Sequence, residues 1–419
     1  MTLAAPALDA DVVWNASHWT YVAEGGANIV VRYTGPEVKP FASDRGPLVL
    51  RVAKTGARRS PLQPDEMIDN VWSQVFPRDH LPMVQRVRIC RTREAAGDNA
   101  QAQFLMALDG RIADARPANR KNAAIDCNAE HIWVMRDESQ GLVFEIKPKC
   151  GYLPSTGSAV KRHYSRYRMH RILKAAEKEQ GAGASSYRVP AISLTEWDAL
   201  YDPLDLFSGD EIRVRKAATA LVADWRTGGN NLRILHCGKA LRPEDRCTAT
   251  LLGTDTIIGE RLSNVLLSAP MQGALSNLKS WQLHLDPFGI DGLMNLWHRV
   301  LPDFEFGDIS VLAPPSVSDY ALFLSQRKYL DREVDMNLRG LRHAVMGHLL
   351  SATCKDLSIM CRYVPDASTL QPIHVDLDAK PITKLGAYAR IDRKVVDIFS
   401  AWAAAVGCTG PILHDTCGI

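Results

Sequence analysis

The sequence predicts an α+β protein, in which a small and mostly β N-terminal lobe precedes a larger lobe that mixes helices and strands. Three observations support this class. Short β-branched runs recur over the first 147 residues, helical periodicity follows over residues 159–179, and strand-like runs return between residues 358 and 377. β-Branched side chains fit a pleated strand, whereas apolar residues three and four apart indicate a helix. At 419 residues the chain is long enough for more than one domain, and we divide it into residues 1–140 and 141–419.

The first part of the chain is expected to form a sheet. Strands are predicted at residues 28–33, 48–53, 104–108, 131–135 and 142–147. Pro61 and Pro64 interrupt this pattern and lead into a helix near residues 69–76, because proline removes a backbone donor. We expect a surface loop at residues 95–103, where no apolar pattern recurs.

Helices are expected in the second part. Over residues 159–179, basic residues recur at every fourth position and form one stripe, which consists of Arg162, Arg166, His170 and Lys174. A small-residue loop over residues 181–186 follows this helix. Asp202 before Pro203 predicts a helix start. Residues 338–353 and 390–405 are further helices, and residues 358–363 and 372–377 between them form a strand pair.

Composition excludes several classes of protein. The chain is 46% hydrophobic and 23% charged with a net charge of +3, which is typical of a folded globular protein rather than a disordered one. No apolar run approaches the roughly 20 residues of a membrane span, and the first residues lack a secretory signal. The nine cysteines never form C-x-x-C, so we expect free thiols in an intracellular protein of the nucleus, the cytoplasm or both. A structural zinc would need ligands from distant segments, for example His236, Cys237 and Cys247.

The most informative segment is the decapeptide Glu145-Ile-Lys-Pro-Lys-Cys-Gly-Tyr-Leu-Pro154. Its lysines, Lys147 and Lys149, flank a proline at the end of an apolar run. Because proline stiffens the backbone, the two ammonium groups point in fixed directions. From Lys147 to Ala176 the chain holds eight Lys or Arg residues and no Asp or Glu, which favours a compact polyanion as the ligand.

Two N-terminal segments are candidates for a phosphate site. Glu24-Gly-Gly-Ala-Asn28 precedes a strand, and its small residues let backbone N–H groups approach an anion closely. A plain hairpin turn has the same pattern. Arg51 is the lone polar residue of the strand at residues 48–53. It is suited to a bidentate grip on ATP phosphates, and the alternative is an edge-strand arginine that points to solvent.

Carboxylates accompany the predicted strand pair near the C-terminus. Asp356 opens one strand, Asp376 and Asp378 alternate on the next, and Lys380 and Lys384 follow. Phosphoryl transfer needs one carboxylate to orient the attacking hydroxyl and another to hold Mg²⁺ near the phosphates. These aspartates meet that need, although strand-end aspartates also cap turns.

The basic helix is also compatible with a nucleic-acid face. Only Tyr164 and Tyr167 interleave with its charges, however, and no known nucleic-acid motif is present. We therefore expect no nucleic-acid partner.

Taken together, these segments resemble the inositol-pentakisphosphate 2-kinase family, which makes inositol hexakisphosphate (phytate) from ATP. The decapeptide is nearly the family signature. The other matching pieces follow in the family's order and are Arg166–Lys174, Asp202–Ser208, Asn230-Asn231, Asp356–Met360 and Asp376–Pro381. The matching pieces span residues 24–388, which is nearly the whole chain.

The resemblance implies a distant relative of protein kinases, with two lobes and an added helical region that binds the inositol phosphate. It implies a kinase that uses ATP and Mg²⁺ to phosphorylate the 2-hydroxyl of inositol 1,3,4,5,6-pentakisphosphate. Five phosphates at roughly −1.5 to −2 each demand several Arg and Lys from separate segments. We expect a monomer with no membrane span, whose partner is the inositol polyphosphate substrate.

The resemblance also implies roles for single residues. The nucleotide site would consist of Gly25, Gly26, Ala27, Asn28 and Arg51, with Asn230 on either the nucleotide or the inositol side. Asp376 would hold Mg²⁺, Asp356 would orient or deprotonate the 2-hydroxyl, and Lys147 would lie near the transferred phosphate. The inositol phosphates would be held by Lys149, Arg166, Lys174, Asn231, Lys380, Lys384, Tyr388 and Arg120.

Two departures from the family pattern are visible. The C-x-x-C of the zinc site in animal and plant relatives is missing, and Lys384 stands where an arginine would give a bidentate contact. Two alternatives stay open: a kinase that accepts a broader range of inositol phosphates, and a polyanion-binding module without catalysis. Asp356 and Asp376 argue against the second, because a binder gains nothing from carboxylates beside its phosphates.

Overall fold

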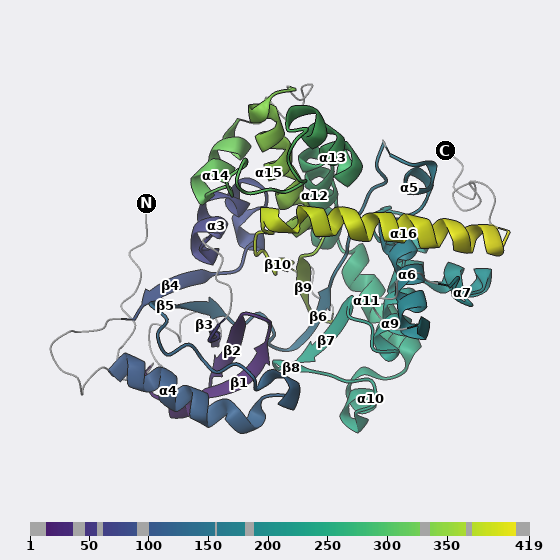
Figure 1. Ribbon diagram of the computed structural model, residues 1–419. Coiled ribbons are helices and arrows are strands. Elements are labelled where there is room, and N and C mark those ends of the chain that lie inside the picture. The colour runs from purple at the N-terminus through teal and green to yellow at the C-terminus, as the bar shows by residue number, and fades with distance from the viewer. Residues whose placement is uncertain are drawn as a thin grey trace.

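The chain folds around two five-stranded antiparallel sheets (Figure 1). The computed structural model describes residues 14–36, 47–56, 62–89, 100–155, 157–180, 188–326, 336–365 and 371–407. The N-terminal sheet has the order β1 (Trp19–Glu24), β2 (Asn28–Tyr33), β3 (Leu48–Ala53), β5 (His131–Arg136) and β4 (Val84–Arg88). The C-terminal sheet has the order β10 (Ile373–Val375), β9 (Ser358–Tyr363), β6 (Leu142–Ile146), β7 (Leu232–His236) and β8 (Lys239–Ala240).

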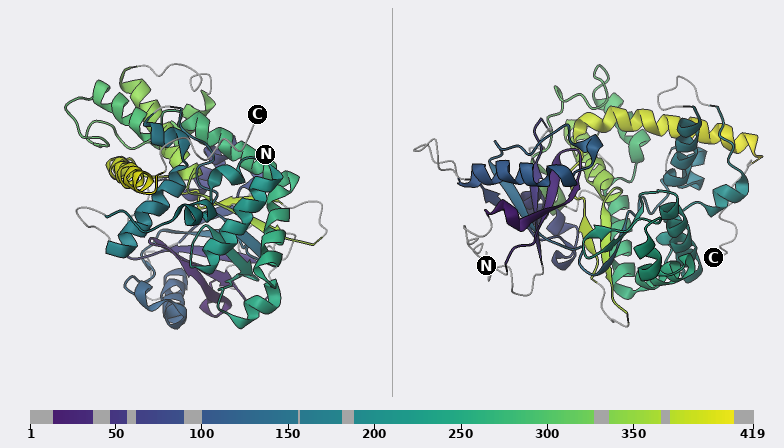
Figure 2. Two further views of the ribbon diagram at one scale, coloured as in Figure 1. Left: turned by 90° about the vertical axis from the view of Figure 1, so that its right-hand side faces the viewer. Right: turned by 90° about the horizontal axis from the view of Figure 1, so that it is seen from below.

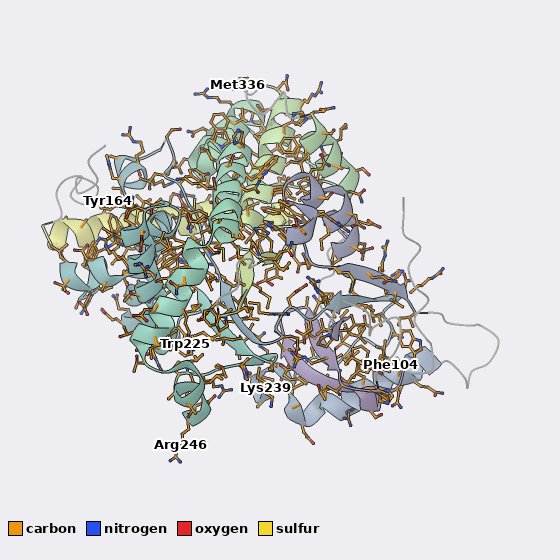
Figure 3. The ribbon with its side chains drawn as sticks, turned by 180° about the vertical axis from the view of Figure 1, so that it is seen from behind. Phe104, Tyr164, Trp225, Lys239, Arg246 and Met336 are labelled. Atoms are coloured by element: carbon orange, nitrogen blue, oxygen red, sulfur yellow. The ribbon has the colours of Figure 1, made fainter. Side chains whose placement is uncertain are left out.

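One face of the N-terminal sheet is covered by α4 (Ala100–Ile112). Strand residues such as Ile29 and Leu50 are fully buried against apolar residues of α4. Phe104, labelled in Figure 3, lies in this layer and is 2% exposed. The strand predicted at residues 104–108 is therefore wrong. Phe104, Leu108 and Ile112 are four apart, a spacing that puts them on one face of a helix.

The other helices of the described residues pack against the C-terminal sheet or against one another. They are α3 (Pro64–Asn70), α5 (Ala159–His163), α6 (Arg166–Gln180), α7 (Leu194–Ala199), α8 (Pro203–Leu206), α9 (Glu211–Arg226), α10 (Arg246–Leu252), α11 (Asp255–Leu267), α12 (Ala269–Leu285), α13 (Gly289–Val300), α14 (Val317–Ser325), α15 (Leu338–Cys354) and α16 (Leu385–Ala405). Short 3₁₀ turns are η1 (Ala16–His18), η2 (Trp72–Gln74), η3 (Arg78–His80), η4 (Ala113–Ala115), η5 (Ala118–Arg120) and η7 (Ile382–Lys384).

The long helix α16 links two groups of helices, as the right-hand view of Figure 2 shows. Its first residues pack with α13 and α15 around Leu385. Its second half packs against α6 and α7, where Phe399 and Trp402 are fully buried. Tyr164, labelled in Figure 3, lies just before α6 with its ring 4.9 Å from that of Phe399. The basic helix α6 is thus held from behind by an apolar core.

One segment of the first 140 residues belongs to the C-terminal core. Trp72 and Phe76 are buried in the same apolar cluster as Phe144 and Ile359 of the C-terminal sheet. The indole N–H of Trp72 donates to the carbonyl of Leu377 at 3.0 Å. A boundary at residue 140 therefore separates the two sheets. α3 and η2 come before this boundary in the chain but pack into the core of the C-terminal part.

Most of the predicted elements are present, and the mixed α+β class is confirmed. Four of the five strands predicted for the first part agree with β2, β3, β5 and β6, and the pair near the C-terminus is β9 and β10. The prediction of one continuous basic helix over residues 159–179 is wrong in one respect, because extended backbone at Tyr164 divides this segment into α5 and α6. Of the predicted loops, residues 95–99 and 181–186 lie outside the described residues, and residues 100–103 begin α4.

The predicted helix starts also have physical support. The Asp202 carboxylate accepts the Leu204 N–H at 3.0 Å and caps α8, with Pro203 at the first helical position. The helix expected near residues 69–76 is the end of α3 followed by η2. α16 begins five residues earlier than its predicted start, at Leu385, because η7 leads directly into it.

No helix among the described residues has the length and apolarity needed to cross a membrane.

Candidate active site

Four strand ends meet at one edge of the C-terminal sheet. β6 pairs with both neighbours, so that Ile146 lies opposite Leu232 of β7 and Ile359 of β9. β10 pairs with β9, with Val375 opposite Ser358. This antiparallel register brings together the residues that follow β6 and β10 and those that precede β7 and β9. They are Lys147, Asp376, Asn231 and Asp356, all of which the sequence singled out.

Asp356 lies between two lysines. Its carboxylate is 3.3 Å from the Lys149 ammonium and 2.7 Å from the Lys380 ammonium. Burial works to raise the pKa of the Asp356 carboxyl, but the hydrogen bond and charge of Lys380, helped by Lys149, hold this pKa below its usual value. Asp356 is therefore a carboxylate at neutral pH. A carboxylate accepts hydrogen bonds, so it is suited to orient a hydroxyl donor.

Lys147 pairs with Asp376 at the same edge. The ammonium is 2.9 Å from the Asp376 carboxylate, whose side chain is 58% exposed. The Ser358 hydroxyl lies 3.4 Å from the same carboxylate oxygen and 2.9 Å from the buried Glu145. The Asp376 carboxylate therefore has a fixed position and an open side.

Two site residues have left-handed backbone, which is strained for any residue other than glycine. Lys149 has φ +66° and Asp376 has φ +61°, and the third such non-glycine residue in the described ranges is Cys237. Left-handed backbone costs roughly 1–3 kcal/mol per residue and persists where surrounding contacts enforce it, often at functional sites. The strain supports Lys149 and Asp376 as functional positions.

The N-terminal sheet contributes Arg51 to this site. From β3, the Arg51 guanidinium makes a bidentate pair with the Asp378 carboxylate, at 2.7 and 3.2 Å. With its amide oriented so that the oxygen faces β3, Asn28 also accepts from Arg51 Nη2 at 2.9 Å. Arg51 thus touches the predicted nucleotide loop on one side and the segment after β10 on the other. The edge-strand alternative for Arg51 is excluded, because β3 lies inside the sheet.

The predicted nucleotide loop is a tight turn between β1 and β2. The Gly25 N–H donates to the Asn28 carbonyl at 2.9 Å, which closes the hairpin. A side chain at Gly25 or Gly26 would meet no other atom within 4 Å, so both glycines border open space. The turn therefore leaves room for a group to approach its backbone.

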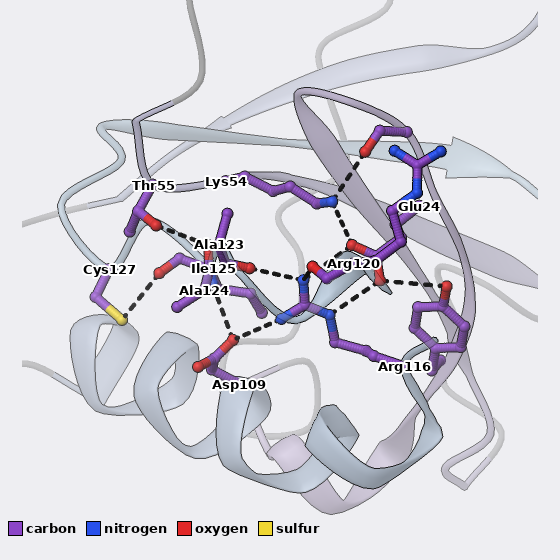
Figure 4. Close-up of polar contacts among 12 residues, drawn as sticks. Glu24, Lys54, Thr55, Asp109, Arg116, Arg120, Ala123, Ala124, Ile125 and Cys127 are labelled. Atoms are coloured by element: carbon purple, nitrogen blue, oxygen red, sulfur yellow. Dashed lines mark hydrogen bonds and ion pairs between the residues drawn. The ribbon is translucent and has the colours of Figure 1, made fainter. Parts of the chain in front are cut away.

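A buried charge cluster anchors this turn (Figure 4). The Glu24 carboxylate pairs with the Lys54 ammonium and, at 2.9 Å, with the Arg116 guanidinium, and all three side chains are at most 4% exposed. Lys54 also donates to the Gly25 carbonyl at 2.9 Å. Arg116 donates to the carbonyls of Arg120 and Ala123 at 2.8 and 2.6 Å. One cluster therefore fixes both the glycine turn and the segment that carries Arg120.

Helix α6 supplies the basic face. Arg166 is half-exposed and donates to the buried Asp392 of α16 at 2.8 Å, while Lys161 pairs with the same carboxylate. Burial, with the charges of Arg166 and Lys174, lowers the pKa of His170 to about 4, and Lys149 adds to this effect. His170 is therefore neutral at physiological pH. The mutual influence of these groups indicates that α6 and the decapeptide border one basic region.

The other predicted contacts differ in their exposure. Asn230 and Lys384 are exposed. Tyr388 is half-buried, and burial together with the Asp356 charge raises the pKa of its phenol, so it lies near Asp356. Asn231 is 1% exposed. Its side-chain amide donates to the Tyr167 hydroxyl, and its backbone carbonyl accepts the Lys147 backbone N–H at 2.8 Å.

This burial favours a supporting role for Asn231, which holds the backbone of Lys147. Direct contact between the Asn231 side chain and a phosphate stays a prediction, because in this structure the amide is enclosed beside Tyr167.

Sequence reasoning missed several members of the site. Asp378 was noted but not assigned to Arg51, and the cluster of Glu24, Lys54 and Arg116 was not recognised. A signal was present in each case. Lys54 directly follows an apolar strand, and Asp378 keeps the two-residue alternation that begins at Asp376. Their partners are far apart in the chain and could not be paired from the sequence.

Comparisons with known proteins identify the family of this chain. A family model described as inositol-pentakisphosphate 2-kinase matches residues 21–394. The inositol-pentakisphosphate 2-kinase of Cryptococcus neoformans var. neoformans serotype D is 30% identical, over 90% of this chain and 92% of that protein. Those of Oryza sativa subsp. indica and Arabidopsis thaliana are 26% and 24% identical, each over 92% of this chain and 94% of the relative. The matched range contains the decapeptide and the strand-end aspartates, and the chain belongs to the inositol-pentakisphosphate 2-kinase family.

Proposed function

We propose that this protein transfers the γ-phosphoryl group of ATP to the 2-hydroxyl of inositol 1,3,4,5,6-pentakisphosphate, which gives ADP and inositol hexakisphosphate. The observation that carries the proposal is the meeting of Lys147, Asp356 and Asp376 at one sheet edge, beside the basic helix α6. Membership of a kinase family supports ATP as the phosphate donor.

The charge around Asp356 suits a crowded polyphosphate. Lys149 and Lys380 flank Asp356, and Arg166 and Lys174 come from α6. These cations derive from separate segments, which lets them surround a small ring that carries roughly −1.5 to −2 on each phosphate. Several of them are paired with carboxylates of the protein, and substrate phosphates would compete for the same ammonium groups.

Asp356 is proposed to orient the acceptor hydroxyl. Its carboxylate accepts a hydrogen bond from the 2-hydroxyl and aligns the oxygen with the phosphorus. Because the pKa of Asp356 is held below its usual value, the group is a weak base. The transition state of phosphoryl transfer is loose in most analyses, so the proton leaves the hydroxyl late and goes to Asp356.

Lys147 and Arg51 are proposed to face the nucleotide phosphates. Lys147 lies at the shared strand edge, where its ammonium neutralises charge on the transferred group. Arg51 offers a planar guanidinium for bidentate binding of phosphate oxygens. Beside it, the turn at Gly25 and Gly26 is open enough for backbone N–H groups to approach a phosphate.

The donor groups present fit a magnesium ion. Asp376 and Asp378 expose carboxylate oxygens, and hard cations prefer such oxygens. No group of three or more His, Cys, Asp or Glu side chains converges in the described residues. Mg²⁺ is usually held by one or two carboxylates together with substrate phosphates, so this small donor set suits it. When bound, Mg²⁺ would neutralise charge on the ATP phosphates, with Asp376 as its main protein ligand.

We further propose that the two sheets mark the two lobes of a distant protein-kinase relative, which acts as a monomer inside the nucleus or cytoplasm. The free thiols of the described cysteines suit a reducing compartment.

One experiment tests the activity. The protein is incubated with ATP, Mg²⁺ and inositol 1,3,4,5,6-pentakisphosphate, and products are separated by ion-exchange chromatography. We expect inositol hexakisphosphate in proportion to ADP, and none without ATP. Absence of hexakisphosphate from folded protein would reject the proposal. Parallel reactions with tetrakisphosphates identify a broader-range kinase, and binding without ADP release identifies a non-catalytic binder.

A further inference from the structure

The buried glutamine Gln282 connects two catalytic segments that are far apart in the chain. Gln282 lies in the last turns of α12 and is fully buried. Its amide donates to the Lys149 carbonyl at 2.8 Å and to the Cys354 carbonyl at 3.1 Å. Its oxygen accepts the Gly151 N–H at 2.8 Å. Both amide hydrogens and the oxygen are therefore used, and all three bonds go to backbone groups.

Two of the three bonded groups belong to the strained turn at Lys149, one on Lys149 itself and one on Gly151. Gln282 binds the carbonyl of Lys149 and the N–H of Gly151, two residues later. Together these bonds fix the turn in which Lys149 has φ +66°. Gly151 has no room for a side chain, because an added Cβ would lie 2.5 Å from the Phe207 ring. The turn therefore depends on a close approach of its backbone to α12 and Phe207.

The third bonded group leads to the catalytic carboxylate. Cys354 ends α15 and precedes Asp356 by two residues. The Asp356 N–H donates to the Thr353 carbonyl at 3.0 Å, so the carboxylate emerges directly from the end of this helix. A displacement of the Cys354 carbonyl would shift Asp356 with it.

A second contact from the same helix end joins the same two segments. The buried Asp286 carboxylate pairs with the Lys355 ammonium at 2.7 Å. The Asp286 carbonyl accepts the Tyr152 hydroxyl at 2.8 Å. Lys355 is next to Asp356, and Tyr152 belongs to the decapeptide. The end of α12 therefore holds residues 149–152 and residues 354–355 at two separate points.

We propose that Gln282 is a positioning residue, which holds the Lys149 ammonium and the Asp356 carboxylate at the spacing that the acceptor substrate requires. Gln282 touches no substrate itself and acts through the backbone of both segments. The expected kinetic effect of Gln282 rests on the proposed function, because the proposed function assigns Lys149 and Asp356 to the inositol phosphate side. Its structural effect does not depend on which substrate binds.

The kinetic test is Gln282→Met, which keeps the side-chain length and removes all three bonds. Misplacement by about 1 Å can cost on the order of 100-fold in rate, so we expect kcat/KM for the pentakisphosphate to fall by about 10- to 100-fold. KM for the pentakisphosphate rises, kcat falls, and KM for ATP is unchanged. The matched control is Gln272→Met on the same helix, where the glutamine amide donates to the Leu266 carbonyl, away from the site.

Amide hydrogen exchange on the protein alone supplies a readout that needs no activity. In the unmodified protein, the Gly151 amide should be protected nearly to the level of global unfolding, because it is buried and bonded to Gln282. In Gln282→Met its exchange becomes faster, and in Gln272→Met it does not. Rapid exchange of Gly151 in the unmodified protein overturns the proposal without any variant.

Gln282→Glu separates the bonds. The carboxyl group still accepts the Gly151 N–H, but it has at most one hydrogen for the Lys149 and Cys354 carbonyls, which the amide of Gln282 binds with two. We expect a protected Gly151 amide together with an impaired kcat/KM for the pentakisphosphate. Unaltered kinetic constants in Gln282→Glu, or faster exchange without a kinetic change in Gln282→Met, would make Gln282 a purely structural residue and overturn the proposal. If the unmodified enzyme forms no hexakisphosphate, the proposed function fails, while the exchange measurements still decide whether Gln282 holds the turn.

Discussion

The charged side chains of the site are paired with one another. Lys147 pairs with Asp376, Arg51 with Asp378, and Asp356 with two lysines. The aspartates of these pairs are at least half exposed, and such pairs contribute little to stability, about 0–1 kcal/mol each. These pairs therefore serve mainly to position the side chains. They hold the ammonium groups and carboxylates in place until substrate phosphates bind the cations.

At this scale we predict that Asp356→Asn abolishes most turnover while the pentakisphosphate still binds. The asparagine amide is a poor acceptor for the hydroxyl proton. Loss of the carboxylate should lower kcat by about 100- to 10,000-fold, the usual range for an acid–base group. Binding measured by calorimetry should be unchanged or tighter, because Lys149 and Lys380 lose a competing carboxylate. The control is Asp303→Asn at an exposed turn position. Turnover near that of the control would remove Asp356 from the catalytic role.

A second residue-scale prediction concerns pH and the buried Asp286. Burial alone would raise the pKa of its carboxyl, but the charges of Lys355 and His348 hold the pKa well below its ordinary value. The unfolded carboxyl titrates near pH 3.9, so the stabilisation is fully present above that pH and is lost as pH falls further. Urea unfolding between about pH 3 and pH 7 should show stability falling at the acidic end.

The variant Asp286→Asn tests this assignment. It should be less stable at neutral pH, because Lys355 loses its buried partner, and its stability should depend less on pH below about 4. An acid dependence as steep as that of the unmodified protein would show that other groups cause it.

At the scale of elements, buried residues of neighbouring helical elements hold parts of the site in place. α12 holds the decapeptide through Gln282, α16 holds Arg166 through Asp392, and η2 holds the segment after β10 through Trp72. Gln282, Asp392 and Trp72 are buried, and each bonds either a charged side chain of the site or backbone in or next to a charged residue. Rigid elements of this kind fix a site more precisely than the loops themselves can.

We predict that Trp72→Phe lowers kcat by about 10-fold, because small misplacements of catalytic groups are costly. The ring stays in the core, but the Leu377 carbonyl loses its partner between Asp376 and Asp378. An unsatisfied buried group costs about 1–3 kcal/mol of stability. The matched control is Trp402→Phe, where a buried indole donates to the Ile192 carbonyl at 2.9 Å. It should lose similar stability and keep its kcat. Equal kcat in both variants would mean that Trp72 serves only the core.

At the scale of the whole molecule, polar contacts among the described residues join the two sheets. Arg51 joins β3 to Asp378 after β10. Arg32 of β2 donates to Asp137 at 2.5 Å and to Ser139 at 3.1 Å, in the link between the two sheets. Segment α3–η2 adds an apolar contact, since it packs into the C-terminal core. The predicted nucleotide site lies where Arg51 bridges these two parts.

We predict that Arg51→Ala raises KM for ATP far more than KM for the pentakisphosphate. A bidentate charge-assisted contact to phosphate contributes roughly 1.5–3 kcal/mol, which corresponds to an increase of about 10- to 150-fold. The free energy of unfolding should change by less than about 1 kcal/mol, because the Asp378 side of the pair is exposed. Arg78→Ala, which removes an exposed pair with Asp69, is the control. Equal effects on both substrates would reject the assignment of Arg51 to the nucleotide.

The candidate site residues were predicted from local patterns in the sequence. The stiffened lysines of the decapeptide, the glycine turn and the alternating aspartates are local patterns, and each reflects a local cause such as proline geometry or strand alternation. Strands β2, β6, β9 and β10 beside them were predicted for the same reason, whereas β1 was not. Segment 104–108 shows the limit, because a short apolar run is compatible with both a strand and a helix.

Which of these residues contact one another became visible only in the folded chain. Three sets of contacts join segments that are far apart in the chain. They are the pair of Arg51 with Asp378, the cluster of Glu24 with Lys54 and Arg116, and the hydrogen bonds of Gln282. Such contacts depend on sheet register and helix packing, which no local pattern encodes. The two lysines of the decapeptide are evident from the sequence, but the backbone of Lys149 is held by Gln282, a contact between residues 133 positions apart.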